Sequence, residues 1–498
     1  MLLTFGARTL AKISKKRFDK WYAHAVAMQQ KVFEELISRG QHTAFGREHQ
    51  LSGVTDHASF ARKVPIREYE DFKPWIDRIL KGEEDVLWPG RPMYLSKTSG
   101  TTSGAKYIPI TKDSMPNHLN STRQALLMYV LKTGKTDFLK GRMIFVSGSP
   151  ELDTSGDIPT GRLSGIAHRH IPFYLRRRRL PSYEVNCIED WEKKLSAIVE
   201  ETADKNMSLI SGIPPWVEMY FERLLTATGK KTISDLYPGF SLFVYGGVNF
   251  QPYERKFRDL IGKEVDSLET FPASEGFVGF QDEWPSEGLL LVPDAGIFYE
   301  FIPADRFHEE DPPRLTLGEV EAGVNYAMIM NTNAGLWGYS IGDTVQFVSL
   351  NPYRFVSTGR LSHFTSAFGE HVIAQEAEDA MTEATTKSGA MVREFTLAPL
   401  VDNPGGKPCH QWFVEFSKKP EDMGYFSKVL DETLQEKNPY YKDLVSGSIL
   451  QPAKVEMVPS GTFNKYMKSI GKLGGQNKVP HLANDRRIAD WISENVLS

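Results

Sequence analysis

The chain has 498 residues, a formal net charge of −4, 41% hydrophobic residues and 24% charged residues. These values are typical of a globular protein with more than one domain, and they exclude nucleic-acid or membrane binding driven by overall positive charge. The two cysteines, Cys187 and Cys409, are too few for a disulfide scaffold and too far apart for a metal cluster, so a reducing cytoplasm is expected.

The first 90 or so residues are predicted to be helical, with a break at Val64-Pro65. One apolar face at helical spacing consists of Trp21, Ala25, Met28, Val32 and Leu36. The basic N-terminal stretch lacks the sustained apolar core of a targeting peptide, so it is interpreted as the first helix. No apolar run reaches the roughly 18 residues of a membrane span.

From residue 142 onwards, strands and helices alternate. Strands are expected at 142–147, 208–213 and 242–245, with helices at 188–204, 214–228 and from about 253. This alternation predicts α/β layers around a mainly parallel sheet. The Gly/Pro/Ser-rich segment 148–165 is expected to be a loop that either moves or lines a site. Strands dominate at 288–356, which predicts an antiparallel sheet or barrel.

A small α+β domain is predicted after Arg360. Its expected elements are a helix from Ile373 to Ala384, strands at 391–400 and 411–416, a helix at 421–435 and a last strand at 454–458. We therefore predict an N-terminal domain at 1–357 and a mobile C-terminal domain at 358–498, with a hinge near Thr358–Leu361.

The segment YLSKTSGTTSGAKYIPIT at 94–111 is the most informative part of the sequence. Its hydroxyls and glycines can bring consecutive N–H groups close to a phosphate chain, and its lysine can add a point charge. The candidate phosphate-binding residues are Ser99, Gly100, Thr101, Thr102, Ser103, Gly104 and Lys106. Composition alone also fits an ordinary loop, and the spacing does not match GxxxxGK[ST].

Two further motifs follow predicted strands. YGGVNF places Gly246 and Gly247 at a strand end, where open α/β sheets bind ligands. ETFPASEGFVGF places Ser274 and Glu275 in a turn, where a hydroxyl can contact phosphate and a carboxylate can bind Mg²⁺. Taken alone, each motif is weak evidence: strand–Gly-Gly–helix junctions are common, and a solvated glutamate beside a turn is the more usual interpretation of Glu275.

Three more polar positions complete the set. Asp343 in WGYSIGDTVQF is expected after a glycine and just before a strand, where it can accept hydrogen bonds from ribose hydroxyls. Arg360 in the Thr-Gly-Arg stretch can reach ribose or phosphate. Lys472 and Lys478 in GKLGGQNKVP can stabilise negative charge in a transition state. A turn aspartate, a surface arginine and solvated lysines are the alternative interpretations.

The order and spacing of these motifs resemble those of the adenylate-forming ligases. Within them, the chain looks most like the auxin-responsive (Gretchen Hagen) family of acyl acid amido synthetases, in a bacterial-type version. The stretches VPIREYEDFKPWIDRI at 64–79 and GTFNKYMKSIGKLGGQNKVP at 461–480 add to this resemblance, which covers nearly the whole chain.

The resemblance implies an α/β fold with two α/β subdomains and a β-barrel in a large N-terminal domain, plus a small α+β C-terminal domain. It implies that Mg²⁺-ATP and a carboxylic acid give an acyl-adenylate and pyrophosphate. An amine, typically an amino acid, then gives an amide and AMP. The rival hypotheses are a ligase that acylates coenzyme A or a carrier protein, and a nucleotide-binding regulator without catalysis.

The same resemblance assigns roles to the candidate residues. The hydroxyl-rich loop with Lys106 would hold the β- and γ-phosphates, Gly246 and Gly247 would lie along adenine, and Glu275 would bind Mg²⁺. Ser274 would touch the α-phosphate or the substrate carboxylate. Asp343 and Arg360 would hold the ribose. Lys478, or alternatively Lys472, would assist adenylation, and residues 214–220 would line the acyl pocket.

Two positions depart from the plant pattern. Ser340-Ile341 stands where plant members carry an arginine and a valine before Gly-Asp, and Gly369-Glu370-His371 stands where they carry a lysine. The run of four arginines from Arg176 to Arg179 is interpreted as a solvated or phosphate-facing turn rather than a nucleic-acid patch. The expected partners are therefore a small carboxylic acid and an amine, with no nucleic acid or membrane.

Overall fold

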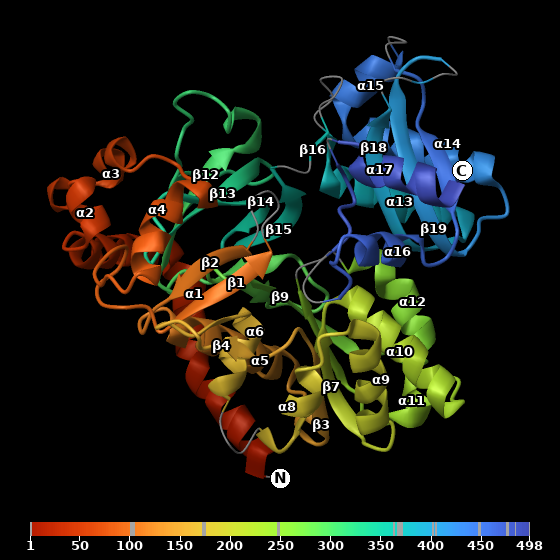
Figure 1. The fold of residues 1–498 in the computed structure, drawn as a ribbon, viewed down its shortest axis with the longest axis horizontal. Coiled ribbons are helices and arrows are strands. Elements are labelled where there is room, and N and C mark those ends of the chain that lie inside the picture. The colour runs from red at the N-terminus through yellow and green to blue at the C-terminus, as the bar shows by residue number, and fades with distance from the viewer. Residues whose placement is uncertain are drawn as a thin grey trace. The chain divides into compact units, whose positions relative to one another are not determined.

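The structure is a computed structural model that describes residues 2–497 except 100–104, 172–175, 247–249, 362–363, 366–371, 401–402, 404–405, 447–449, 475–477 and 484. The chain forms two units, one of residues 1–248 and 261–356 and one of residues 249–260 and 357–498. Their helices and strands carry the labels of Figure 1. Each unit has its own hydrophobic core.

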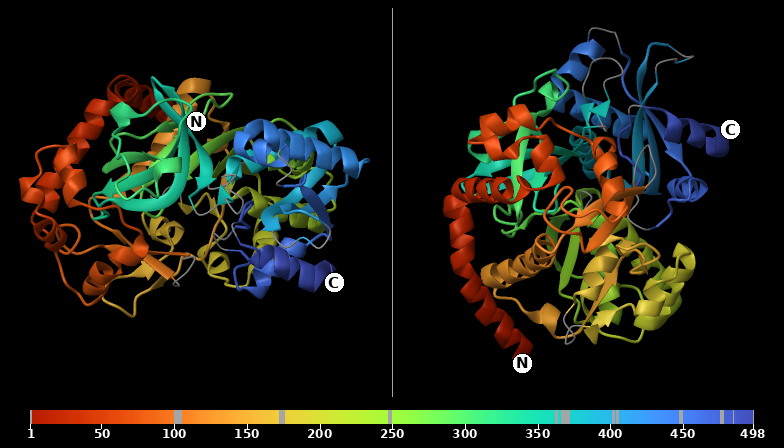
Figure 2. Two further views of the ribbon diagram at one scale, coloured as in Figure 1. Left: turned by 90° about the horizontal axis from the view of Figure 1, so that it is seen from above. Right: turned by 60° about the vertical axis from the view of Figure 1, so that its left-hand side comes forward.

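Helices make up the N-terminal part of the large unit, as predicted. They are α1 (Leu2–Gly40), α2 (Ala44–Glu48), α3 (His57–Lys63) and α4 (Tyr69–Leu80). The long α1 runs along one side of this unit (Figure 2) and buries Trp21 and Leu36. The break at Val64-Pro65 separates α3 from α4, because proline cannot supply the N–H that would continue a helix.

The hydroxyl-rich segment lies between two paired strands. β1 (Tyr94–Ser99) and β2 (Ala105–Ile110) are antiparallel, with Ser99 opposite Ala105, so residues 100–104 join adjacent strand ends. The predicted loop at 148–165 is more regular than expected. It contains β4 (Leu152–Asp153) and β5 (Thr160–Gly161), and β5 extends the β1–β2 pair because its backbone pairs with Leu95 and Ser96.

An eleven-stranded sheet forms the centre of the large unit. Its order is β12-β13-β14-β15-β11-β10-β9-β8-β7-β3-β6. The parallel part contains β3 (Arg142–Val146), β6 (Arg179–Leu180), β7 (Met207–Gly212), β8 (Leu242–Gly246) and β9 (Asp266–Pro272). The antiparallel part contains β10 (Phe277–Gln281), β11 (Leu289–Leu291), β12 (Ile297–Pro303), β13 (Asn325–Thr332), β14 (Tyr339–Leu350) and β15 (Tyr353–Arg360). The predicted parallel and antiparallel regions are thus continuous.

Helices cover both faces of the parallel part (Figure 1). On one face, α1 and α5 (Met115–Thr133) pack against a cluster that includes Met143, Leu209 and Leu242. On the other face, α10 (Pro214–Thr228) places Val217 against Gly212, and α9 (Trp191–Thr202) packs beside α10. With both faces covered, the edge at the carboxyl ends of the strands is where ligands bind in such sheets.

The small unit is an α+β domain, as the sequence predicts. β18 (Met391–Leu400), β19 (Cys409–Lys418) and β20 (Lys454–Val458) form its three-stranded sheet. Helices α13 (Ala374–Ser388) and α14 (Met423–Lys437) share a core with one face, while α16 (Thr462–Ser469) and α17 (Arg487–Ile492) share a core with the other. The short α12 (Gln251–Ile261) groups largely with this unit.

A buried histidine fixes the segment that follows Lys478. His481 lies between two carboxylates, with Nδ1 2.8 Å from Glu378 and Nε2 2.9 Å from Glu394. Burial opposes the charge, but hydrogen bonds to the two carboxylates raise the His481 pKa to about 10. The His481 carbonyl also accepts a hydrogen bond from the Leu397 N–H, so the chain after residue 480 is attached to β18.

We expect His481→Gln to destabilise the small unit by about 3 kcal/mol near pH 6, because two buried carboxylates lose their cation. The stabilisation should be complete below the unfolded-state pKa of about 6.5 and should disappear as the pH rises through about 10. Hydrogen exchange of β18 amides across this range measures the effect, with the exposed His42→Gln as control. An equal loss near pH 6 and pH 10 would contradict this role.

Candidate functional site

A tight turn between β9 and β10 presents Ser274 and Glu275. The Ala273 N–H donates to the Gly276 carbonyl at 2.9 Å, and the Gly276 N–H donates back at 3.2 Å, so the two polar residues occupy the tip. Ser96 Oγ, in β1, donates to Ser274 Oγ at 3.0 Å. This contact brings the turn to the strand that leads into the hydroxyl-rich loop.

A tyrosine of the WGYSIGDTVQF segment contacts the other polar residue of this turn. Tyr339, at the start of β14, donates from its hydroxyl to Glu275 Oε1 at 3.4 Å. The Tyr339 ring is buried against Phe72 in an edge-to-face arrangement, which fixes its hydroxyl. Ser96 and Tyr339 were not singled out from the sequence, because a partner in a distant strand leaves no local signal.

Asp343 lies within β14, whereas the sequence suggested a position just before a strand. Ala327 pairs with Thr344 and Ile329 pairs with Ser340, so an irregularity in the pairing includes Asp343. Gly342 has φ +80°, a conformation that suits glycine. Such irregularities redirect side chains beside functional sites. The Asp343 side chain is half-buried.

Gly246 allows β8 and β9 to approach closely. A Cβ atom on Gly246 would lie 2.2 Å from the Thr270 carbonyl oxygen, a separation that real Cβ atoms do not reach. The Thr270 hydroxyl also donates to the Tyr245 carbonyl at 2.9 Å. Gly246 thus has a packing role at the carboxyl end of the parallel strands. Gly247 lies outside the described residues.

Lys106 lies in β2 with its ammonium 5.6 Å from the centre of the Tyr69 ring. Ser99 and Arg360 are the last residues of β1 and β15, and the structure does not describe their side chains. The remaining predicted phosphate-binding residues lie outside the described residues; they are Gly100, Thr101, Thr102, Ser103 and Gly104.

The two candidate lysines belong to the small unit. Lys472 follows α16, and its N–H donates to the Met467 carbonyl at 2.8 Å. Lys478 is exposed and lies just before the segment attached to β18. The backbone just after Lys478 is therefore held against β18, while the Lys478 side chain is exposed.

The donor set around Glu275 fits a magnesium ion bound together with phosphate. Within the described ranges, no group of three or more His, Cys, Asp or Glu side chains is arranged to hold a metal. Mg²⁺ typically uses one or two carboxylates and completes its shell with water and substrate phosphates. A single carboxylate beside the Ser274 hydroxyl meets that requirement, because the other ligands would come with the nucleotide.

A second carboxylate, which was not among the candidates from the sequence, lies near the carboxyl end of β8. Glu269 of β9 pairs in register with Tyr245 of β8, and the Tyr245 hydroxyl lies 3.5 Å from Glu269 Oε2. Burial raises the pKa of Glu269 to about 7. The strand also contains Asp266, Ser267 and Thr270, so no signal in the sequence set Glu269 apart.

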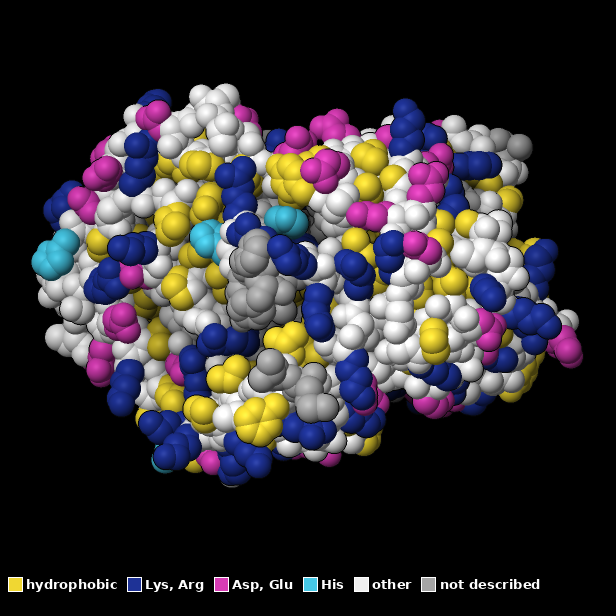
Figure 3. Space-filling view, turned by 90° about the horizontal axis from the view of Figure 1, so that it is seen from below, with side chains coloured by type: hydrophobic (Ala, Val, Ile, Leu, Met, Phe, Trp, Pro, Cys, Tyr) yellow, Lys and Arg dark blue, Asp and Glu magenta, His cyan; other side chains and the backbone are white. Residues whose placement is uncertain are grey.

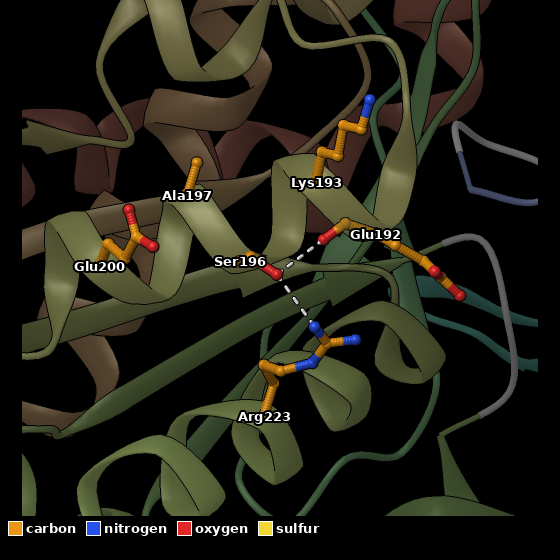
Figure 4. A pocket seen from close by; sticks show the side chains of 6 residues that line it. All are labelled: Glu192, Lys193, Ser196, Ala197, Glu200 and Arg223. Atoms are coloured by element: carbon orange, nitrogen blue, oxygen red, sulfur yellow. Dashed lines mark hydrogen bonds between the residues drawn. The ribbon is translucent and has the colours of Figure 1, made fainter.

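A shallow surface pocket lies apart from this site, between α9 and α10 (Figure 4). It has a volume of about 370 Å³ and is lined by Glu192, Lys193, Ser196, Ala197, Glu200 and Arg223. Arg223 donates to Ser196 Oγ at 2.9 Å. No lining side chain comes from β1, β9 or β14, so the described pocket is not part of the candidate site.

The arginine run is used for internal contacts. Arg176 donates to the carbonyls of Ile171 and Arg169, while Arg179 lies 4.5 Å above the Phe145 ring. Arginines engaged in this way leave fewer guanidinium groups for a nucleic acid. Figure 3 shows basic and acidic side chains together on one face of the molecule. Separately, no described helix is both long and apolar enough to cross a membrane.

Comparisons with solved structures define the class of fold. The acyl acid amido synthetase AtGH3.15, solved in complex with 2,4-DB, superposes with a TM-score of 0.79 at 17% identity, covering 98% of this chain and 96% of that one. A 2-hydroxyisobutyryl-CoA ligase in the postadenylation state gives a TM-score of 0.61 at 12% identity, covering 94% and 91%. The fold is therefore that of the adenylate-forming ligases.

Sequence comparisons give the family. Models of the GH3 family N-terminal, central and C-terminal domains match residues 14–182, 290–360 and 375–487, more than two thirds of the chain together. The chain belongs to the GH3 family. It is 23% identical to indole-3-acetic acid-amido synthetase GH3.3 of Arabidopsis thaliana, covering 95% of this chain and 91% of the relative. It is 22% identical to jasmonoyl-L-amino acid synthetase GH3.5 of Oryza sativa subsp. japonica, covering 96% of each.

We expect Glu269→Gln to stabilise the large unit by about 2 kcal/mol near pH 8 and to change little near pH 4. The folded-state pKa of about 7 lies above the ordinary value of 4.5, so ionisation of Glu269 destabilises the wild-type protein as the pH rises between these values. Urea denaturation at both pH values measures the difference. A gain of the same size at both would show that the carboxyl charge is not responsible.

Proposed function

We propose that the protein is an ATP-dependent acyl acid amido synthetase, which joins a carboxylic acid to an amine through an acyl-adenylate. Membership of the GH3 family supports this, because the relatives named above conjugate acids to amino acids. The single structural observation that carries it is the Ser96–Ser274 contact. This contact sets a hydroxyl and the Glu275 carboxylate beside the strand that enters the hydroxyl-rich loop.

In the first half-reaction, a carboxylate oxygen of the acid attacks the α-phosphorus of ATP and pyrophosphate leaves. The hydroxyl-rich loop and Lys106 hold the departing phosphates, and Ser274 positions the α-phosphate or the substrate carboxylate. Glu275, oriented by Tyr339, would hold Mg²⁺, which would supply neutralisation of phosphate charge when bound. Gly246 and Gly247 lie along adenine, and Asp343 with Arg360 holds the ribose.

In the second half-reaction, an amine nitrogen attacks the acyl carbon and AMP leaves. A carboxylate is a poor electrophile, whereas the adenylate carries a good leaving group, so the work of the protein is positioning and charge stabilisation. The C-terminal domain, residues 358–498, moves between the two steps. It brings Lys478, or alternatively Lys472, to the first one. Residues 214–220 line the acyl pocket.

We also propose that this is a bacterial-type member acting in the cytoplasm, to which the hormone specificity of the plant enzymes is not carried over. The departures at Ser340-Ile341 and Gly369–His371 support a separation from the plant pattern. Two free cysteines, Cys187 and Cys409, are consistent with a reducing compartment.

We expect the purified protein to exchange labelled pyrophosphate into ATP when a suitable carboxylic acid is present. A panel of acids should be tested first, followed by amino acids and coenzyme A with mass analysis of the product. An amide supports the proposal, whereas a thioester would indicate the coenzyme A ligase. ATP binding without exchange on any acid would indicate a regulator and would overturn the proposal.

We expect Lys106→Ala to slow adenylation about a hundredfold or more and to affect amide formation from preformed acyl-adenylate much less. Lys106 acts on the departing phosphates, which are absent in the second step. Thr102→Ala should show the same asymmetry. Lys73→Ala, an exposed lysine of α4, is the matched control. Equal losses in the two half-reactions would contradict the assigned role.

A further inference from the structure

The segment at 64–79, which carries part of the family resemblance, lies between two parts of the candidate site. Residues 64–68 connect α3 to α4, and α4 begins at Tyr69. The backbone of Arg67 and the side chains of Tyr69 and Phe72 contact strands β2 and β14. These two strands carry Lys106 and Tyr339, so the segment joins the lysine of the candidate site to the tyrosine that contacts Glu275.

Tyr69 holds the outer edge of β2. The order of the four-stranded sheet is β2-β1-β5-β4, so β2 is its edge strand. The Tyr107 N–H in β2 donates to the Tyr69 hydroxyl at 2.7 Å. The preceding residue is Lys106, whose ammonium lies 5.6 Å from the centre of the Tyr69 ring, within reach of a cation–π interaction. One side chain therefore contacts both the backbone and the cation of this strand.

The Tyr69 side chain is itself held in place by the core. Its exposed fraction is 6%, and it belongs to a hydrophobic cluster that also contains Leu95 of β1 and Ile108 of β2. Side chains in a close-packed core keep defined rotamers. The ring and hydroxyl of Tyr69 are therefore presented to β2 in a fixed geometry.

The same segment also holds Tyr339. The Arg67 N–H donates to the Gly338 carbonyl at 2.8 Å, and the Ser340 N–H donates to the Arg67 carbonyl at 2.8 Å. These two bonds lie on either side of Tyr339, whose ring packs edge-to-face on Phe72 with 5.6 Å between the ring centres. Tyr339 is thus attached to this segment through its neighbouring backbone groups and through its side chain.

The contacts form a closed chain around the candidate site. It runs from β2 to α4, from α4 to β14, from β14 to the turn between β9 and β10, and from that turn to β1, which pairs with β2. Tyr69 and Phe72 are one turn apart on α4, so the first two steps share one rigid element. Lys106 and Glu275 are therefore held in one frame, because neither strand nor turn can shift without breaking a contact.

We propose that Tyr69 is a positioning residue that sets the Lys106 ammonium for the β- and γ-phosphates of ATP. This inference rests on the proposed function, which assigns Lys106 to the departing phosphates. The Tyr69 ring limits where a flexible lysine side chain can lie, and its hydroxyl holds the backbone from which that side chain extends. Because Tyr69 acts through Lys106, its effect should be confined to ligands that carry the outer phosphates.

The first test measures nucleotide binding without turnover. Calorimetry compares Mg²⁺-ATP with AMP, which lacks the β- and γ-phosphates, on the wild-type protein and on Tyr69→Leu and Tyr69→Phe. We expect Tyr69→Leu to weaken Mg²⁺-ATP binding about tenfold, and Tyr69→Phe about threefold because phenylalanine keeps the ring but lacks the hydroxyl. The affinity for AMP should change by less than about twofold in both variants.

Phe60→Leu is the matched control for loss of core packing. Phe60 is fully buried in the same hydrophobic cluster as Tyr69, and its ring packs on Phe33, Trp337 and Arg314. Phe60→Leu should lower the unfolding temperature, as Tyr69→Leu does, and should leave both nucleotide affinities unchanged. A loss of Mg²⁺-ATP affinity in Phe60→Leu as large as that in Tyr69→Leu would indicate that core packing alone is responsible.

A double-mutant cycle tests whether Tyr69 acts through Lys106. Lys106→Ala should weaken Mg²⁺-ATP binding, and the addition of Tyr69→Leu should cause little further loss. A second tenfold loss in the double variant would overturn the inference, because Tyr69 would then act independently. Equal losses for Mg²⁺-ATP and AMP, or no loss in either Tyr69 variant, would also overturn it. If Tyr69→Leu does not fold, the same cycle with Tyr69→Phe decides.

Pyrophosphate exchange keeps this inference apart from the proposed function. With an acid that is adenylated, Tyr69→Leu should raise the KM for ATP and leave amide formation from preformed acyl-adenylate unchanged. Exchange that neither Tyr69 variant alters would overturn the role of Tyr69 and leave the proposed function intact. A selective loss of Mg²⁺-ATP affinity without exchange on any acid would support the role of Tyr69 and reject the proposed function.

Discussion

The turn between β9 and β10 is the constraint on which the candidate site depends. It connects the parallel and antiparallel parts of one continuous sheet, so its position is fixed from both sides. Hydrogen bonds from Ser96 and Tyr339 then attach its two polar residues to strands far away in the sequence. Ser274 and Glu275, which we propose to contact phosphate and Mg²⁺, are thereby held on rigid elements, as catalysis by positioning requires.

Several buried cations of this chain are paired with carboxylates. Arg354 contacts Asp282, Arg314 contacts Glu300, and His481 lies between Glu378 and Glu394. Pairing of this kind offsets the cost of burying a charge, and loss of one partner would leave the other charge buried alone.

Much of the fold could be predicted from local pattern. The strand at 391–400 and the last strand at 454–458 were predicted with their observed boundaries, because apolar and β-branched residues mark them clearly. The segment 148–165 was expected as a loop but contains β4 and β5. These strands exist because β5 pairs with β1, a tertiary contact that outweighs the local turn-forming composition.

The sequence by itself determined the order of elements, the family resemblance and the types of residue in the site, because periodicity and motif spacing are local properties. Only the tertiary structure decided that Ser96 reaches Ser274 and that Tyr339 orients Glu275. Contacts between distant segments depend on how strands order themselves in a sheet. Neither spacing nor composition records that order, so the partners of Ser274 and Glu275 become visible only in the folded chain.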